Sequence, residues 1–242
     1  MTTETSQITI SGMPVSIVRK SIKNLHLGVY PPNGRVRVAA PLAVSDDAVR
    51  RAVISRLGWI KRQLARFSAQ LREPVREMVN GESHYFLGHR YRLRVVADQG
   101  PGRVVLRGRT VVELHVRPDA DTEARRQLLH AWYRERLREL IPKLVDKWQT
   151  RLGVRAADWR IRQMKTKWGS CNPDARRIWL NLELAKKPVR CLEYIVVHEL
   201  LHLRARRHDA RFLALMDKHL PGWQQRRREL NAAPLAHERW SY

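Results

Sequence analysis

The chain has few cysteines, few acidic residues and no long hydrophobic run. Only Cys171 and Cys191 occur among its 242 residues, which excludes a disulfide framework. No stretch approaches the roughly 20 apolar residues that a transmembrane helix needs, so we expect no membrane partner. The first six residues lack the basic segment and the apolar core of a signal peptide. Together these absences predict a cytoplasmic protein.

The shortage of acidic residues leaves a large positive charge. Lys and Arg number 47 against 23 Asp and Glu, which gives a net charge of +24. Such a charge attracts polyanions at low salt. The basic residues are spread along the chain, however, without a C-x-x-C finger, a recognisable nucleic-acid module or a long basic tail. Contact with nucleic acid through this surface therefore stays open, beside a merely solvated arginine-rich surface.

The first 117 residues are predicted to be β-rich with one helix. The strand patterns come in pairs that flank turn residues, such as Gly12 and the Pro-Pro-Asn-Gly sequence at 31–34. Ser45 can cap a helix whose apolar residues continue to Leu64. The predicted strands cover residues 7–10, 15–19, 25–30, 35–39, 85–87, 91–96, 104–106 and 111–116.

The pattern becomes helical after residue 117. Asp121 can cap a long helix, which Pro142 should kink or divide. Two strands are predicted around a polar loop at 165–176, and a further helix can begin at Pro188. The predicted strands are 159–164 and 178–182, and the helices start near 121, 188, 209 and 223. We therefore expect an α+β protein with two regions, 1–117 and 118–242, without an internal repeat, although strands of both regions could share one sheet.

The sequence His-Glu-Leu-Leu-His at 198–202 carries the clearest chemical signal. On a helix, His198 and His202 share one face, so both imidazoles can reach one metal ion. Glu199 is rotated by about 100° from His198, which brings its carboxylate beside an open coordination position. There it can take a proton from metal-bound water, whose pKa the ion lowers to about 7. Two histidines one turn apart with a Glu between them are hard to explain by packing alone.

His208 is the preferred third ligand, because the chain can turn before it and a new helix can begin at Asp209. The alternative is that Asp209 completes the site. Neutral imidazole completes common zinc sites, so Zn²⁺ is the expected cofactor. The five-residue gap between His202 and His208 is also that of the metzincins, but Ala205 stands where their pattern has Gly, which argues against a metzincin.

The loop that contains Lys167, Trp168, Gly169 and Ser170 is a candidate substrate-binding segment. Gly169 allows an unusual backbone angle, and neighbouring amides or the Ser170 hydroxyl could donate to a developing oxyanion. Lys165 or Lys167 could attract an anionic group. The simpler interpretation is a hairpin loop with a tryptophan lid. Cys171, at the end of this loop, is interpreted as an inert thiol.

Four ordered segments make the chain similar to a known family. They are residues 164–171, 178–181, 196–203 and 208–212, and segments at 19–24, 35–41 and 57–60 match as well. With these segments the chain resembles the YgjP-like metal-dependent hydrolases, which are similar to the SprT-like metallopeptidases. The resemblance extends over nearly the whole chain. It implies a minimal zincin fold in residues 118–242, with helices around a small antiparallel sheet and the metal helix at the centre.

The resemblance also implies roles for particular residues. It assigns the third metal ligand to His208 and the general base to Glu199, and it places the loop 168–171 beside the active site. The family commonly has Ser after the third His, where this chain has Asp209. Asp at this position can still cap the following helix.

These observations favour a zinc-dependent metallopeptidase that acts on protein or peptide substrates. The first alternative is a metal-dependent nucleotide phosphohydrolase, because a metal ion can polarise a phosphoryl oxygen and the basic residues favour an anionic substrate. The sequence has neither a P-loop nor an Asp-rich two-metal set, which weakens this alternative. The second alternative is a nucleic-acid-associated protein that processes DNA-bound proteins.

Overall fold

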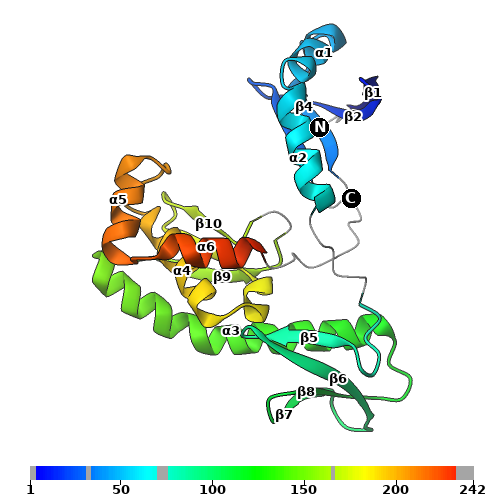
Figure 1. Ribbon diagram of the computed structural model, residues 1–242, viewed down its shortest axis with the longest axis vertical. Helices are drawn as coiled ribbons and strands as arrows, with labels where there is room; N and C mark the ends of the chain where they lie inside the picture. Colours follow the sequence, from blue (N-terminus) through cyan, green and yellow to red (C-terminus); the bar gives the residue numbers. More distant parts are fainter. Residues whose placement is uncertain (1–3, 31–33, 70–75, 165–166, 233–242) are drawn as a thin grey trace. The chain divides into compact units, whose positions relative to one another are not determined.

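The computed structural model describes residues 4–30, 34–69, 76–164 and 167–232 (Figure 1). The chain divides into two compact units, Met1–Arg72 and Glu73–Tyr242, each with a hydrophobic core of its own. This division differs from the expected one at 117–118, because strands that precede residue 117 share a core with the helix that follows it. None of the helices in the described residues is long and apolar enough to cross a membrane.

The first unit combines one sheet with two helices. The sheet has the order β1-β2-β4-β3, in which β2 and β4 pair in parallel and the outer pairs are antiparallel. Ser45 caps the first helix, as expected, by accepting a hydrogen bond from the N–H of Ala48. The predicted single helix is in fact two, because α1 ends at Ser55. The elements are β1 Glu4–Ile10, β2 Met13–Lys20, β3 His26–Tyr30, β4 Arg35–Pro41, α1 Asp46–Ile54 and α2 Leu57–Ala69.

The second unit begins with another four-stranded sheet, in the order β5-β6-β8-β7. Alternation along β6 and β8 places Tyr91, Leu93, Val112 and Leu114 in the core, as a period of two requires. The next residue along β6, Arg94, points to the other face and is exposed, and it forms an ion pair there with the buried Glu113 of β8. The strands are β5 Ser83–Phe86, β6 His89–Ala97, β7 Arg103–Arg107 and β8 Val111–Val116.

The two four-stranded sheets have the same topology, although no internal repeat was expected from the sequence. Each consists of two hairpins joined by a parallel central pair. Their first turns match in backbone conformation: Ser11 and Gly12 have φ of 49° and 75°, and Leu87 and Gly88 have φ of 49° and 85°. Each sheet is also followed by a helix that a polar side chain caps. The residues differ between the two copies, so the likeness lies in backbone geometry and polarity pattern.

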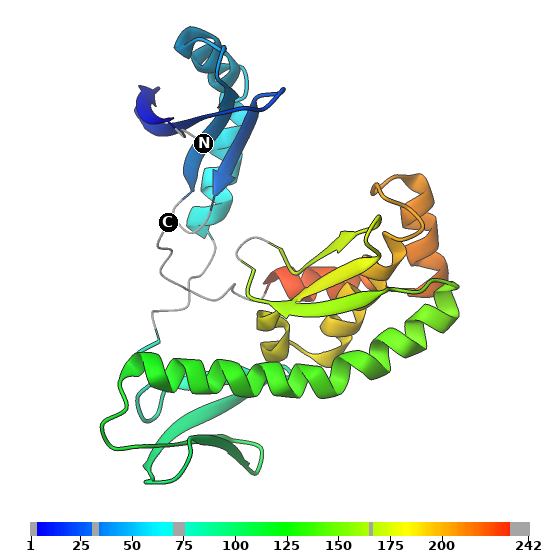
Figure 2. The same ribbon diagram turned by 180° about the vertical axis from the view of Figure 1, so that it is seen from behind.

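A 31-residue helix, α3 (Thr122–Leu152), connects the second sheet to the rest of the unit. Asp121 caps its start, accepting from the N–H of Ala124 at 2.7 Å, and Gly153 ends it in the left-handed conformation. Pro142 lies inside the helix without dividing it, and Figure 2 shows that the helix axis bends toward its C-terminal part. Its buried residues form one stripe: Leu129, Tyr133, Leu137, Ile141, Val145, Trp148 and Leu152.

A third, smaller sheet lies beside the remaining helices and has the order β10-β11-β9. Residues 165–176, which were expected to form a polar loop, contain strand β10. The expected antiparallel sheet is mixed for the same reason: β10 is the antiparallel return strand, so β11 runs parallel to β9. The strands are β9 Asp158–Arg162, β10 Gly169–Asn172 and β11 Arg177–Asn181.

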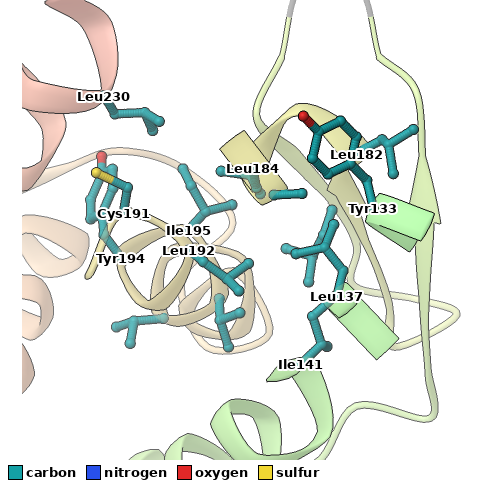
Figure 3. Packing of buried hydrophobic residues seen from close by; sticks show 14 of the residues in the cluster. Tyr133, Leu137, Ile141, Leu182, Leu184, Cys191, Leu192, Tyr194, Ile195 and Leu230 are labelled. Carbon is teal, nitrogen blue, oxygen red and sulfur yellow. The ribbon is translucent and has the colours of Figure 1, made fainter. Parts of the chain in front are cut away.

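Helix α4 (Val189–Leu201) occupies the centre of the second unit, and nine of its 13 residues are buried. Leu192 and Ile195 pack between α3 and the other helices, as the close view in Figure 3 shows. The N–H groups of Leu87 and Gly88 donate to the carbonyls of Ala185 and Lys186, which precede α4. A Cβ added at Gly88 would lie 2.7 Å from the Pro188 ring, so the β5–β6 turn packs closely on the start of the helix. The other elements are the 3₁₀ helix η1 Leu182–Lys186 and the helices α5 Ala210–His219 and α6 Trp223–Ala232.

A chain that begins at Glu73 should fold by itself, whereas one that begins at Pro118 should not reach the same stability. The shorter fragment loses the partners of α3 on the second sheet, including the carbonyl of Tyr85 that accepts from Tyr133 at 2.7 Å and the Phe86 ring 4.6 Å from Trp132. Each large apolar side chain that returns to water costs about 1.5–3 kcal/mol. Urea unfolding followed by circular dichroism would test this. Equal midpoints for both fragments would contradict the observed division.

Candidate metal centre

Three histidines converge at the C-terminal end of α4. His198 and His202 lie one turn apart on the helix, and His208 lies in the segment that leads to α5. One ring nitrogen from each of the three lies within 4.8 Å of the other two, and the Nε2 atoms of His198 and His208 are 2.9 Å apart. These three side chains could together hold a metal ion, and the described residues contain no other such group.

The backbone between α4 and α5 explains why His208 joins the cluster. Helix α4 ends at His202, and the buried Ala205 anchors the turn that follows. Asp209 then caps α5, because its carboxylate accepts from the N–H of Phe212 at 3.0 Å. This hydrogen bond occupies the side chain that was the alternative third ligand. The structure therefore brings His208, and not Asp209, to the other two histidines.

The histidine rings are held in place by a hydrogen bond and by one aromatic side chain. The carbonyl of Ala205 can only accept, so Nδ1 of His202, 3.1 Å away, carries the proton and leaves Nε2 as an electron-pair donor. Phe212 is almost fully buried, and its ring centroid lies 4.8–5.0 Å from those of all three histidines. Such fixed rings are typical of imidazoles that bind metal.

The protonation states of the histidines also suit a cation. Burial, followed by the nearby His202, His208 and Arg227, lowers the pKa of His198 to about 3. Burial also lowers the pKa of His202, against the opposing effect of the Ala205 carbonyl. Both imidazoles are consequently neutral near pH 7, which is the form that donates an electron pair to a metal. The residues present thus fit a metal ion that favours nitrogen ligands.

Glu199 lies beside the cluster and is only 4% exposed. Burial raises the pKa of its carboxyl group to about 8, although Lys167 acts in the opposite direction. A carboxyl group with such a pKa can both accept and release a proton near neutral pH. This is the property that a general base requires when it later returns the proton.

The carboxylate of Glu199 packs directly on the backbone of β10. A Cβ added at Gly169 would lie 2.7 Å from Cγ of Glu199, a contact that real Cβ atoms do not make. Gly169 therefore permits the close approach of strand and carboxylate through its lack of a side chain, whereas the sequence analysis attributed its role to an unusual backbone angle. Because Gly169 is the first residue of β10, the strand fixes one wall of the site.

Asn181 binds the backbone of Met164 and Lys167, and no role was predicted for it. It is fully buried, and its side-chain amide donates to the carbonyls of Met164 and Lys167 at 2.7 and 2.8 Å. Its Oδ1 accepts from the N–H of Met164 and from that of Glu183. An Asn within the apolar strand pattern that follows the polar loop is the signal that could have identified this residue, because a polar side chain buried there needs hydrogen-bond partners.

A cleft of about 620 Å³ opens over the histidines and Glu199. The four residues predicted to contact substrate, Lys167, Trp168, Gly169 and Ser170, all line it. Cys171 lines it too, but burial and the nearby Glu199 raise the pKa of its thiol to about 11, so the thiol is protonated at neutral pH. Tyr194 and Arg227, for which no role was predicted, are further lining residues. The spacing of Tyr194, His198 and His202 by one turn each could have placed the tyrosine there.

Replacement of His208 by alanine should lower the bound metal content by far more than replacement of His89, an exposed histidine on β6. Loss of one of three protein ligands weakens a zinc site strongly, because the remaining two cannot complete its coordination. Elemental analysis of both purified variants and of the unchanged protein measures the effect and identifies the ion. Equal metal content in all three proteins would exclude His208 as a ligand.

Comparison with known proteins adds a family to this geometry. The chain matches none of the curated proteins with which it was compared. Among solved structures it is similar to the metallopeptidase zymogen of Pyrococcus abyssi abylysin, with 23% identity, coverage of 37% of this chain and 90% of that chain, and a TM-score of 0.35. The family model of the YgjP-like metallopeptidase domain matches residues 23–233. The chain therefore belongs to the YgjP-like metallopeptidases, which are metal-dependent peptidases.

Proposed function

We propose that the chain is a zinc-dependent peptidase in which His198, His202 and His208 hold the ion and Glu199 is the general base. The observation that carries this proposal is the position of Glu199: a buried carboxylate, next to three converging imidazoles, at the floor of an open cleft. Zinc suits the site because three imidazoles leave one of its four preferred positions free. When bound, zinc acts as a Lewis acid that polarises a carbonyl oxygen and increases the acidity of water.

Proton transfer is the task of Glu199. Its carboxylate would take the proton of the attacking water and later give it to the leaving amine of the cleaved peptide. Burial raises the pKa of this carboxyl group to about 8. Near neutral pH the group can therefore both take up a proton and release it again. Contact with Gly169 fixes the carboxylate against β10, so that it faces the substrate in one orientation.

The edge of β10 offers a place for an extended peptide. In the described residues β10 pairs with β11 on one side, and no strand pairs with its other side. An extended chain can add to such an edge through backbone hydrogen bonds, which do not depend on its side chains. Gly169 and Ser170 begin this edge beside Glu199, so a peptide bond placed there would lie within reach of the base.

A protein or peptide is the partner that family membership favours. The alternatives of a nucleotide phosphohydrolase and of a protein that acts near DNA continue to rest on the net charge of +24. Charge alone supports association with any polyanion and does not select a reaction. We therefore retain hydrolysis of peptide bonds as the proposed activity.

The variant Glu199→Gln should keep its metal and lose peptide hydrolysis. Glutamine has nearly the same shape but cannot accept the proton, and loss of a general base typically lowers the rate about 10²–10⁴-fold. Turnover of an unfolded protein substrate and elemental analysis give the two measurements. The exposed Glu135→Gln on α3 is the control and should behave like the unchanged protein.

Unchanged turnover in Glu199→Gln would end the proposed mechanism. A parallel assay with a nucleoside triphosphate distinguishes the reaction classes. Phosphate release that depends on Glu199, in the absence of peptide cleavage, would replace the peptidase by a phosphohydrolase.

Removal of the Asn181 amide should lower the peptidase kcat about tenfold or more without removing the metal. In Asn181→Ala and Asn181→Asp the carbonyls of Met164 and Lys167 lose their donor, so the segment before β10 is no longer held. Small displacements of a catalytic wall have effects of this size. Asn80→Ala removes an Asn side chain that accepts from the N–H of Val95 in the second sheet, away from the cleft, and should leave kcat unchanged. Equal kcat values for all these variants would show that the segment does not need Asn181.

A further inference from the structure

The cleft over the metal centre is positively charged. Three basic residues line it, Lys167, Arg206 and Arg227, whereas Glu199 is its one acidic lining residue among the described residues. Glu199 is buried at the floor of the cleft, so its charge is withdrawn from the entrance. A cleft lined by one sign of charge concentrates ligands of the opposite sign.

The three cations are not equivalent. Arg206 forms an ion pair with Asp174 at the rim, which neutralises much of its charge. For Lys167 and Arg227, by contrast, the described part of the chain provides no carboxylate at ion-pair distance. Both residues line the cleft, so their positive charge faces it.

The packing of α6 on α4 explains the direction of Arg227. Two ion pairs join these helices, Arg226 to Glu193 at 2.8 Å and Arg190 to Glu229 at 2.6 Å. They fix the rotation of α6 about its axis. Arg227 follows Arg226 by about 100° around the helix, which turns it toward the histidines. Arg228 is turned by a further step and does not line the cleft.

We propose that Arg227, assisted by Lys167, binds a carboxylate of the peptide substrate close to the scissile bond, so that the enzyme prefers acidic peptides. This inference rests on the proposed peptidase function. The planar guanidinium can donate two parallel hydrogen bonds to a carboxylate, which a hydrated ammonium cannot do. The carboxylate can belong to an Asp or Glu side chain or to the C-terminus of the substrate.

The test compares peptides that differ in one charge. End-blocked peptides with Asp or Glu at each position flanking the cleaved bond are compared with the same peptides carrying Asn, Gln or Lys. We expect kcat/KM to be about fivefold higher for the best acidic peptide than for its amide counterpart, as for one partly exposed ion pair. The preference should shrink in high salt, because ions screen such pairs.

Charge reversal at one position provides the decisive variant. Arg227→Gln should abolish the preference for acidic peptides, and Arg227→Glu should reverse it in favour of Lys peptides. Arg228→Glu makes the same change in net charge on the next residue of α6, outside the cleft, and should keep the preference of the unchanged protein. Metal content and circular dichroism of each variant confirm that the site and the fold are intact.

A second arm distinguishes the two sources of the carboxylate. Peptides with a free C-terminal carboxylate are compared with amidated ones of the same neutral sequence. A preference for the free carboxylate that disappears in Arg227→Gln would assign Arg227 to the substrate terminus, whereas a preference confined to Asp and Glu would assign it to side chains.

The results also distinguish a failure of the proposed peptidase function from a failure of the inference about Arg227. If the unchanged protein cleaves no peptide, the peptidase function fails, and the specificity inference fails with it. If it cleaves neutral, basic and acidic peptides equally, or if Arg227→Glu keeps the preference for acidic peptides, the peptidase function stands and the inference about Arg227 is overturned.

Discussion

The burial of helix α4 is the constraint on which the site depends. Its apolar faces are covered by α3, the third sheet and α6, so the helix can neither rotate nor slide without exposing Leu192 or Ile195. That fixed rotation directs His198 and His202 to one side and Glu199 to another. The same burial removes water from these three polar groups. It keeps the imidazoles neutral and raises the pKa of the carboxyl group to about 8.

Residues outside α4 then fix the positions of its histidines and of Glu199. Ala205 orients the ring of His202, Phe212 supports all three imidazoles, and Gly169 gives the Glu199 carboxylate its place against β10. Asn181 holds the carbonyls of Met164 and Lys167, which precede that strand.

The packing of α6 on α4 also decides where the positive charges of α6 lie. The ion pairs between α4 and α6 neutralise one side of α6, while Arg227 on its other side keeps its charge in the cleft.

Most elements of this fold could be predicted from local patterns. The caps Ser45, Asp121 and Asp209 correspond to expectation, because such signals depend on near neighbours in the sequence. Strand β10 was not predicted, because it has only four residues and two of them, Gly169 and Asn172, are of types with little strand propensity. The common topology of the first two sheets was also missed, because it is a likeness of backbone conformation rather than of residue identity.

The sequence by itself determined which groups could perform the chemistry. Helix periodicity alone places His198 and His202 on one face with Glu199 beside them, and the sequence favours His208 as the third ligand. Only the tertiary structure decided that Asp209 is occupied by the cap of α5, that Gly169 serves a close contact, and that Arg227 reaches the cleft. The physical reason is range: periodicity relates residues within one helix, whereas burial, close contacts and the field in a cleft arise when separate segments pack together.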